Sequence, residues 1–414
     1  MNYIIKTIQG CNLACIYCYE QPQNRLNRAL DIADARLFLQ KVHDYYARHK
    51  PTEVLSFHWH GGEPMLRGAA FFEQIITFQR QVFGDHLRWC NSLQSNLTLL
   101  DDAFIELFKK YENCLTLGIS FDFFGHDRVD PRNRSINEHV WRNIRRLQEA
   151  GVQTNFVTML TRGNVEHLDE LYELLRSENI SIRFNQVFGA PRRRRFNRPS
   201  VRLRNSQFRE ALTRFTRRWL DDGESSFCIN NAERIATKII NPSATRMCWY
   251  EKNCLEEHMA ICPDGTVFPC DSFYVDGYSY GNILRDDYES LLASSARQRL
   301  LQAQAAVTQE CEQCEYLKYC NGGCPTRSIF GVPRKRIRLR KDPLCAAHRD
   351  LFEMIGSYLV EQGVVPPDWT QRAPTPESIR ERLAACGGRR RPLPMTARAA
   401  EPEPRTRAEL RSAR

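Results

Sequence analysis

The chain has 414 residues, of which 42% are hydrophobic and 26% are charged, and its formal net charge is +10. This length allows one large domain or two to three smaller ones. The sequence has neither a run of about 20 apolar residues that could span a membrane nor a charged segment followed by an apolar one at its start. Because 16 cysteines without a secretory signal favour a reducing compartment, we expect a cytoplasmic protein whose cysteines are metal ligands or buried thiols.

The positive charge is concentrated at the C-terminus. Residues 371–414 contain eleven arginines and five glutamates, a net charge of +6. Two further basic runs lie at 192–195 and 333–341, but such runs are more often solvated loops than binding sites. The charge therefore does not by itself indicate a nucleic-acid partner.

Residues 1–190 alternate short β-branched or aromatic runs with amphipathic helical patterns, in six units. Strands that alternate with helices indicate parallel strands joined by right-handed crossovers. Six such units predict an open α/β barrel, a partial (β/α)6 barrel related to the eight-fold barrel, with its functional residues at the C-terminal ends of the strands. The predicted strands span 3–8, 54–60, 87–94, 115–121, 152–160 and 180–187, and the predicted helices span 33–49, 69–83, 102–111, 138–150 and 166–177.

The first predicted strand leads into a loop, GCNLACIYCYE, that contains Cys11, Cys15 and Cys18. A cubane iron–sulfur cluster normally takes four cysteine thiolates, so three would leave one iron open to a small molecule. The alternative is a zinc site completed by a histidine. Zinc sites usually take their cysteines in CxxC pairs, and the spacing of Cys11 and Cys15 differs from that pattern, so we favour the iron–sulfur interpretation.

With Tyr17 before its last cysteine, this CxxxCxxC loop resembles the signature of the radical S-adenosylmethionine (SAM) superfamily. The resemblance implies that the amino and carboxylate groups of SAM chelate the open iron. An electron then splits SAM to methionine and a 5′-deoxyadenosyl radical, which abstracts hydrogen from a substrate. The sequence WHGGEP at the end of the second predicted strand resembles the family's GGE motif, which implies that Gly61, Gly62 and Glu63 hold the SAM amino group.

The third and fourth predicted strands end in QSNL and SFDF, which resemble the family's QTNG and SLDG stretches with the last glycine replaced. The resemblance implies that Gln94, Asn96, Ser120 and Asp122 face the SAM ribose and the substrate. The segment that follows resembles an HDxxR stretch, which implies that Arg134 binds the SAM carboxylate.

A second cysteine-rich region begins near residue 246. Its spacings are compatible with zinc, the default for an isolated domain. The stretches ICPDGTVFPCDSF, YGNI and CNGGCP, however, closely resemble the SPASM extension of radical SAM peptide maturases and of anaerobic sulfatase maturases. The resemblance implies two auxiliary [4Fe-4S] clusters, three clusters in all, with Cys262 as a competitor of Cys254. The implied ligands are Cys248, Cys254, Cys270 and Cys324 for the first auxiliary cluster and Cys311, Cys314, Cys320 and Cys345 for the second.

These patterns predict five segments. The radical SAM barrel spans 1–190, bridging helices at 206–221 and 229–240 lie within 191–245, and the SPASM domain spans 246–350. A C-terminal helix and linker follow at 351–370. The basic tail, 371–414, is predicted to be disordered apart from a short helix at 376–384, because its Arg-, Pro- and Ala-rich composition cannot bury enough apolar surface.

We expect an enzyme that oxidatively modifies a side chain in a ribosomally made peptide, forming an intramolecular crosslink. Its partners would be the precursor peptide or protein and an electron donor such as flavodoxin or ferredoxin. Asp271, directly after Cys270, matches the acid proposed as general base in sulfatase maturases, although it could also cap a turn.

Two alternatives stay open. One is an anaerobic sulfatase maturase that converts Cys or Ser to formylglycine. The third and fourth strands end in QSNL and SFDF rather than QTNG and SLDG, and the chain has a basic tail. Both differences from the sulfatase maturases favour the crosslink over this reaction. The other is a zinc-bearing nucleic-acid-binding protein, which is disfavoured because aromatic residues are not interleaved with the basic runs.

Overall fold

A computed structural model describes residues 1–20, 28–187, 201–223, 226–244, 248–251, 254–274, 277–329 and 340–372, together with 375, 377–378 and 382. The predicted basic tail, its short helix and the two basic runs lie largely or wholly outside these residues. None of the helices in the described part of the chain is long and apolar enough to cross a membrane.

The strands form a nine-stranded sheet in the order β6-β5-β4-β3-β2-β1-β7-β8-β9. Strands β1 to β6 are parallel and paired in chain order, which is the connectivity expected of an open barrel. All six predicted strands are present, with ends within two residues of those predicted. Their bounds are β1 Asn2–Ile8, β2 Val54–Gly61, β3 Arg88–Ser95, β4 Leu115–Ser120, β5 Thr154–Leu160 and β6 Ile182–Gln186.

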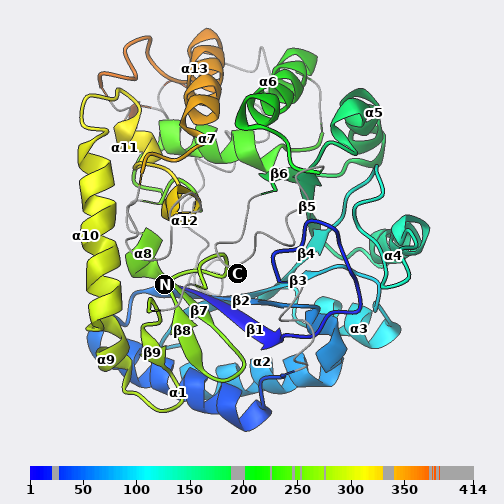
Figure 1. Ribbon diagram of the computed structural model, residues 1–414, viewed down its shortest axis with the longest axis vertical. Helices are drawn as coiled ribbons and strands as arrows, with labels where there is room; N and C mark the ends of the chain where they lie inside the picture. The colour runs from blue at the N-terminus through cyan, green and yellow to red at the C-terminus, as the bar shows by residue number, and fades with distance from the viewer. Residues whose placement is uncertain are drawn as a thin grey trace, which may run out of the picture.

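The connecting helices lie along the outside of the curved sheet (Figure 1). They also agree with the predicted helices within two residues at each end. A short 3-10 helix, η1 (Pro64–Arg67), follows β2. The helices are α1 Ile32–His49, α2 Ala69–Phe83, α3 Asp102–Lys110, α4 Asn137–Glu149 and α5 Leu168–Glu178, and the bridging helices are α6 Asn205–Asp222 and α7 Asn230–Ile240.

The alternation of side chains along β2 shows how the sheet separates core from site. Phe57 and Trp59 are buried on the side of the helices, and Phe57 stacks on Phe83 of α2 with ring centroids 5.7 Å apart. Because successive strand residues point to opposite faces, the intervening His58 and His60 point into the barrel. The apolar residues of β2 therefore build the core, while its polar residues line the interior.

The open edge of the barrel is covered by α7 rather than by a further strand. The backbone N–H of Phe184 in β6 donates to Asn231 Oδ1 at 2.8 Å, and Asn231 Nδ2 donates back to the Phe184 carbonyl oxygen at 3.0 Å. An unpaired sheet edge exposes hydrogen-bonding groups, and one side chain satisfies two of them here.

The C-terminal region extends the same sheet beyond β1. Strand β7 (His258–Ile261) pairs with β1 in parallel, with Asn2 opposite His258, and β8 (Thr266–Phe268) and β9 (Gly281–Asn282) follow antiparallel. The barrel and the cysteine-rich region thus share one sheet.

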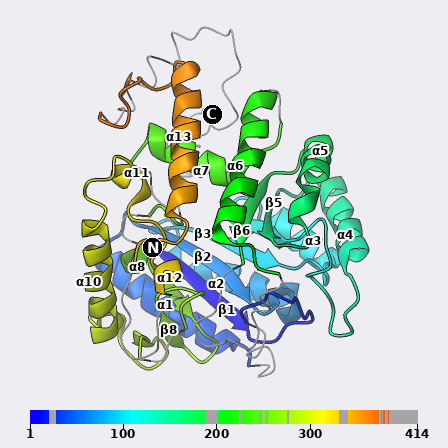
Figure 2. The ribbon, with the colours of Figure 1, turned by 45° about the horizontal axis from the view of Figure 1, so that its top comes forward.

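The other helices of this region surround the open side of the barrel. Helix α13 lies beside α6 and α7 (Figure 2). These helices are α8 Cys254–Glu257, α9 Tyr288–Leu292, α10 Ser295–Gln309, α11 Leu317–Cys320, α12 Pro325–Ile329 and α13 Cys345–Glu361.

Candidate active site

The cysteine loop begins where β1 ends and is held by the segment that follows β4. The backbone N–H groups of Ala14 and Ile16 donate to the carbonyl oxygens of Val129 and Asp127, each at 2.8 Å. These hydrogen bonds to the segment after β4 fix the loop, so its three cysteines have defined positions.

The three thiols of this loop are close enough to influence one another. Burial raises the pKa of Cys11 to about 12 and also raises the pKa of Cys15 and Cys18, and negative charge on Cys15 raises the pKa of Cys11 and Cys18 further. Buried thiols that repel one another as thiolates need a bound cation to be ionised together, and a metal deprotonates the thiols that coordinate it. The loop has the chemistry of a metal-cluster ligand set.

The paired glycines after β2 allow the second strand to approach the start of the loop. A Cβ on Gly62 would lie 1.9 Å from the Gly10 carbonyl oxygen. The backbone N–H of Glu63 donates to that same oxygen at 2.9 Å. Only glycine fits at position 62 because the two backbones are in contact.

Glu63 is buried and joins the ends of β2 and β3. Its Oε1 accepts from the Met65 backbone N–H at 2.9 Å and from Ser95 Oγ at 2.8 Å, and its Oε2 accepts from the Asn96 backbone N–H at 2.8 Å. Burial raises the pKa of Glu63 to about 6, although these hydrogen bonds act in the opposite direction. Each carboxylate oxygen has about two acceptor sites, so Oε2 retains one for a ligand.

The polar residues predicted at the ends of β3 and β4 lie together at this end of the barrel. Gln94 Nε2 donates to Ser120 Oγ at 2.8 Å, and Asn96 Nδ2 lies 3.9 Å from Cys11 Sγ. Leu97, which replaces the family's glycine, adopts the left-handed conformation that glycine favours, with φ of 63°. The segment thus has a left-handed backbone at this position even though the residue is leucine.

Asp122 belongs to a buried polar group beside the cysteine loop. It accepts hydrogen bonds from the Tyr17 hydroxyl and, at 2.9 Å, from the Met159 backbone N–H. The Arg128 guanidinium lies 3.7 Å from Asp122 Oδ2 and 3.9 Å from Cys15 Sγ. Arg128 therefore places a positive charge next to Cys15 of the loop.

Arg134, by contrast, does not lie where the sequence motif suggested. Its side chain is 69% exposed and pairs with Asp130 at 2.7 Å. This placement does not support the expected contact with the SAM carboxylate. The other arginine of that segment, Arg128, is the one that lies beside Asp122 and Cys15.

Asp271, which follows β8, lies against the cysteine loop from the other side. The hydroxyl of Tyr19, the residue after Cys18, donates to Asp271 Oδ2 at 2.9 Å. Burial opposes ionisation, but the electrostatic interaction with His60, hydrogen bonds from Cys270 and Tyr19, and the charge of Lys6 together lower the pKa of Asp271. The site therefore favours a charged carboxylate next to the loop.

The thiols assigned to the first auxiliary cluster gather behind Asp271. Burial raises the pKa of Cys254, Cys270 and Cys324. Negative charge on Cys248 and Cys324 raises the pKa of Cys254 further. Negative charge on Cys254 and Cys324 likewise raises the pKa of Cys270. Cys262 lies elsewhere, packed with Ala260 and Tyr274. This geometry favours Cys254 over Cys262 as a ligand.

The four cysteines assigned to the second auxiliary cluster, Cys311, Cys314, Cys320 and Cys345, line one pocket.

The turn that precedes Cys324 allows the side chain of Asp342 to approach its backbone closely. Asn321, Gly322 and Gly323 have left-handed backbones, with φ of 52°, 86° and 78°, and a Cβ on Gly323 would lie 2.6 Å from Asp342 Oδ2. Glycine at 323 thus leaves room for Asp342.

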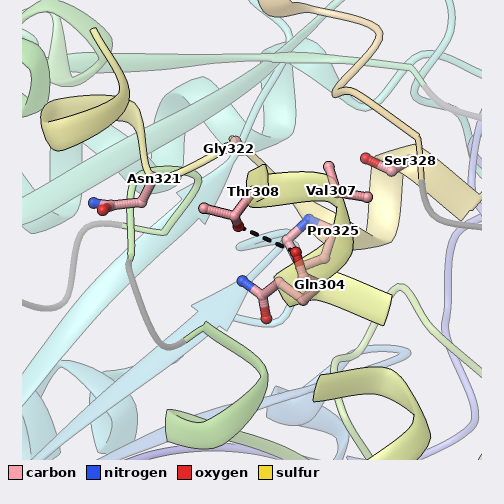
Figure 3. A pocket seen from close by; sticks show the side chains of 8 residues that line it. Gln304, Val307, Thr308, Asn321, Gly322, Pro325 and Ser328 are labelled. Atoms are coloured by element: carbon pink, nitrogen blue, oxygen red, sulfur yellow. Dashed lines mark hydrogen bonds between the residues drawn. The ribbon is translucent and has the colours of Figure 1, made fainter. Parts of the chain in front are cut away.

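Helix α10 packs against this turn from outside. Figure 3 shows Gln304, Val307 and Thr308 of α10 around a small pocket shared with Asn321 and Gly322. The Thr308 hydroxyl donates to the Gln304 carbonyl oxygen at 3.1 Å. Because the Thr308 hydroxyl is bonded within the helix, we regard this pocket as a packing contact.

Asp342 anchors the turn through a buried ion pair. It forms an ion pair with Arg327, and both side chains are buried. It also accepts a hydrogen bond from the Cys324 backbone N–H at 2.8 Å. Burial opposes its ionisation, but the charges of Arg327 and His348 and their hydrogen bonds lower the pKa of Asp342 strongly.

We predict that Asp342→Asn lowers the free energy of unfolding by roughly 3–5 kcal/mol, because Arg327 would stay buried without a counter-charge. Since the folded-state pKa is lowered, this stabilisation is present above the pKa of a free aspartate, about 4, and is lost as the pH falls below it. Urea denaturation would measure the difference. The exposed Asp368, 3.9 Å from Arg372, is the control, and Asp368→Asn should cost less than about 1 kcal/mol. Equal losses in both variants would contradict a special role of Asp342.

The two cysteine-rich sites each offer four cysteine thiols. Cys311, Cys314, Cys320 and Cys345 line one pocket. Four thiolates are the ligand set of a [4Fe-4S] cluster.

Comparison with known proteins supports this assignment. A family model described as the radical SAM superfamily matches residues 5–175, and one described as an iron-sulfur cluster-binding domain, SPASM, matches residues 248–315. The chain is 24% identical over 330 residues to a cysteine-type anaerobic sulfatase-maturating enzyme of Clostridium perfringens, covering 76% of this chain and 86% of the relative. It is 27% identical to a serine-type enzyme of Klebsiella aerogenes, covering 76% and 77%.

A third relative is the antilisterial bacteriocin subtilosin biosynthesis protein AlbA of Bacillus subtilis, 24% identical over 326 residues and covering 77% of this chain and 66% of AlbA. Among solved structures, native anSMEcpe with bound AdoMet superposes with a TM-score of 0.75 at 21% identity, covering 87% of this chain and 98% of that one. Streptococcus suis SuiB bound to its precursor peptide SuiA gives 0.58 at 17% identity, covering 83% and 75%. The chain therefore carries a radical SAM domain and, in its C-terminal half, a SPASM iron–sulfur cluster-binding domain.

Proposed function

We propose that the protein cleaves SAM to a 5′-deoxyadenosyl radical and oxidatively modifies a side chain of a ribosomally made peptide, forming an intramolecular crosslink. One observation carries the proposal: Asp271 of the SPASM domain is hydrogen-bonded to Tyr19, the residue that follows Cys18 of the radical SAM loop. A base held beside the radical site suits a reaction that removes a proton after hydrogen abstraction.

Three [4Fe-4S] clusters would be held by the eleven cysteines named above, and when bound they supply electron transfer and SAM cleavage. The protein's own residues position the reactants. Glu63 Oε2 can accept a hydrogen bond from the SAM amino group, and Gln94, Asn96, Ser120 and Asp122 line the same end of the barrel. Arg128 brings a positive charge to the side of Cys15.

The proton chemistry is assigned to Asp271. Oxidation of a substrate radical releases one electron and one proton, and a carboxylate that the protein keeps ionised is ready to accept that proton. We place this chemistry in the cytoplasm, with flavodoxin or ferredoxin as the class of electron donor.

A second candidate is the conversion of a sulfatase Cys or Ser to formylglycine. It is supported by the names of the two sulfatase-maturating relatives, while the AlbA relative supports a peptide-maturing role. The match of both modules to iron–sulfur families leaves the zinc-bearing nucleic-acid-binding alternative without support.

The test is an anaerobic assay of the reconstituted, reduced enzyme with SAM. The panel comprises the short peptides encoded beside its gene and sulfatase-derived Cys and Ser peptides. We expect 5′-deoxyadenosine together with a gene-neighbour peptide that has lost two hydrogens and is unreactive towards a hydrazide probe. Modification of the sulfatase peptides to a hydrazide-reactive aldehyde would establish the second candidate instead, and absence of SAM cleavage would refute both.

Glu63→Gln should weaken SAM binding by roughly tenfold to a hundredfold, because it removes a charged acceptor from the ligand amino group. Iron content should stay unchanged. Since burial raises the pKa of Glu63 to about 6, SAM binding by the unaltered protein should also weaken as the pH falls below about 6, where the carboxylate loses its charge. Equilibrium binding at several pH values would measure both effects.

The matched control is Glu73→Gln, which alters an exposed glutamate paired with Lys110 at 2.6 Å and should leave SAM affinity unchanged. If Glu63→Gln binds SAM as the unaltered protein does, Glu63 has only the structural role of joining β2 and β3.

A further inference from the structure

The inner face of β6 carries an arginine and an asparagine. Phe184 is buried and packs edge-on against Phe215 of α6, with ring centroids 4.9 Å apart. Since successive strand residues point to opposite faces, the flanking Arg183 and Asn185 point into the barrel. Asn185 Oδ1 is buried and has no hydrogen-bond partner among the residues that the structure describes. Buried polar atoms are nearly always bonded, so this face has the character of a binding site for a polar group.

Arg183 is held by an aromatic ring instead of by an acid. Its guanidinium lies over the Trp249 indole, 4.9 Å from the ring centroid, and no acidic side chain in the described part of the chain pairs with it. Arg327 lies over the same ring at 4.4 Å, but its charge is balanced by Asp342. A guanidinium that stacks on a ring keeps its in-plane N–H donors, which match the two oxygens of a carboxylate. Arg183 is therefore a preformed carboxylate-binding group.

The ring that holds Arg183 comes from the other domain. Trp249 has a φ of 87°, which a bulky residue seldom adopts, and such conformations persist where the surrounding structure holds them. The next residue, Tyr250, is buried, and its hydroxyl is hydrogen-bonded to His348 Nδ1 at 2.8 Å. The SPASM domain thus fixes the indole against an arginine of the barrel.

A second cation approaches β6 from α7. Asn231 of α7 is bonded to the backbone of Phe184, and Arg234, three residues further on, lies on the same face of the helix. Arg234 Nη1 is buried and has no hydrogen-bond partner among the described residues. Burial and the positive charge of Arg183 lower the pKa of Arg234 to about 10. Two cations without an acidic partner on one side of the barrel favour the binding of an anion.

We infer that Arg183, with Arg234 and Asn185 on the same side of the barrel, binds a carboxylate of the peptide substrate. This inference rests on the proposed function. At neutral pH, the anionic groups of an unmodified ribosomal peptide are its Asp and Glu side chains and its C-terminal carboxylate. The ion pair orients the peptide in the barrel and selects peptides that carry an acid at one position. Arg183 is thus a specificity-determining residue that does not take part in the radical chemistry.

The test measures equilibrium binding of peptide to the reconstituted enzyme with SAM but without reductant, so that no reaction occurs. The probe is whichever panel peptide the reduced, unaltered enzyme modifies. Each of its carboxylates is neutralised in turn, by Asn for Asp, Gln for Glu or a C-terminal amide. One of these changes should weaken binding roughly tenfold to a hundredfold, because a charged hydrogen-bonded pair is lost.

Arg183→Gln should weaken binding of the unaltered peptide to the same extent, and neutralising that carboxylate should then have no further effect. Arg183→Lys keeps the charge but not the planar donors, so it should recover part of the affinity. The matched control is Arg145→Gln, which alters an exposed arginine paired with Glu178 at 2.6 Å and should leave peptide binding unchanged. Iron content and the EPR spectrum of the reduced clusters should be the same in Arg183→Gln as in the unaltered protein.

The proposal is overturned if no neutralised peptide binds the unaltered enzyme more weakly, or if Arg183→Gln and neutralisation weaken binding independently. A changed iron content or EPR spectrum in Arg183→Gln, without any dependence on the charge of the peptide, would also overturn it. That result would make Arg183 a counter-charge for the cluster assigned to Cys248. An unaltered enzyme that neither cleaves SAM nor modifies a panel peptide would instead refute the proposed function.

Discussion

Replacing Cys11, Cys15 and Cys18 together by alanine should abolish SAM cleavage and remove about a third of the iron. The reconstituted protein should hold about twelve irons, four in each of three clusters, and the triple variant about eight. The reason is structural: the three thiols belong to one loop, which is fixed by hydrogen bonds to residues 127 and 129, and no other cysteine is assigned to it. Iron analysis and quantification of 5′-deoxyadenosine would measure both effects.

Cys262→Ala is the matched control for this experiment. Cys262 is as buried as Cys15, each with 7% of its surface exposed, but it packs with Ala260 and Tyr274 rather than with the other thiols. Its replacement should therefore retain about twelve irons. Loss of four irons in this variant would make Cys262 a ligand in place of Cys254, and stoichiometric zinc without iron would refute the cluster assignment.

Asp271→Asn should separate radical formation from product formation. Asparagine keeps the shape of the side chain but removes the base, so 5′-deoxyadenosine should still form in the presence of peptide. Modified peptide should fall on the order of a hundredfold to ten-thousandfold. Mass spectrometry of the peptide and chromatography of the nucleoside would follow the two products in one reaction.

The surface residue Asp264, which pairs with Arg28 at 3.1 Å, provides the control. Asp264→Asn changes the same chemical group in the same domain and should leave both products unaltered. If Asp271 only caps a turn beside Cys270, Asp271→Asn should lose iron or stability, and both products should fall together. That result would show that another residue is the base.

The sequence predicted the barrel well because its signals are local. Each strand of the barrel is a short β-branched or aromatic run, and each helix has an amphipathic pattern, so alternation along the chain indicates the parallel topology. Because functional residues of such barrels lie at the C-terminal ends of the strands, the sequence also placed Glu63, Asn96 and Asp122 at one edge of the barrel. These three side chains do lie beside the cysteine loop.

The features that the sequence did not predict depend on long-range contacts. Nothing in the four residues of β7 indicates that they pair with β1. Asn231, which covers the edge of β6, looks like an ordinary helix residue. Arg128 and Arg134 are equally plausible candidates for a contact with SAM in a segment rich in arginine. Only the structure distinguishes them, because Arg128 is buried and Arg134 is exposed. Tyr19 likewise gains its role from Asp271, which lies 252 positions away along the chain.

The pairing of β1 with β7 also has a consequence for biosynthesis. The N-terminal strand is made first, yet its second neighbour begins at His258. At a synthesis rate of about 5–20 residues per second, β1 waits on the order of ten to fifty seconds with one edge open. An open edge invites pairing with another nascent chain. Ribosome-bound chains released before residue 258 should therefore aggregate, and a barrel expressed without β7 should need a chaperone to stay in solution.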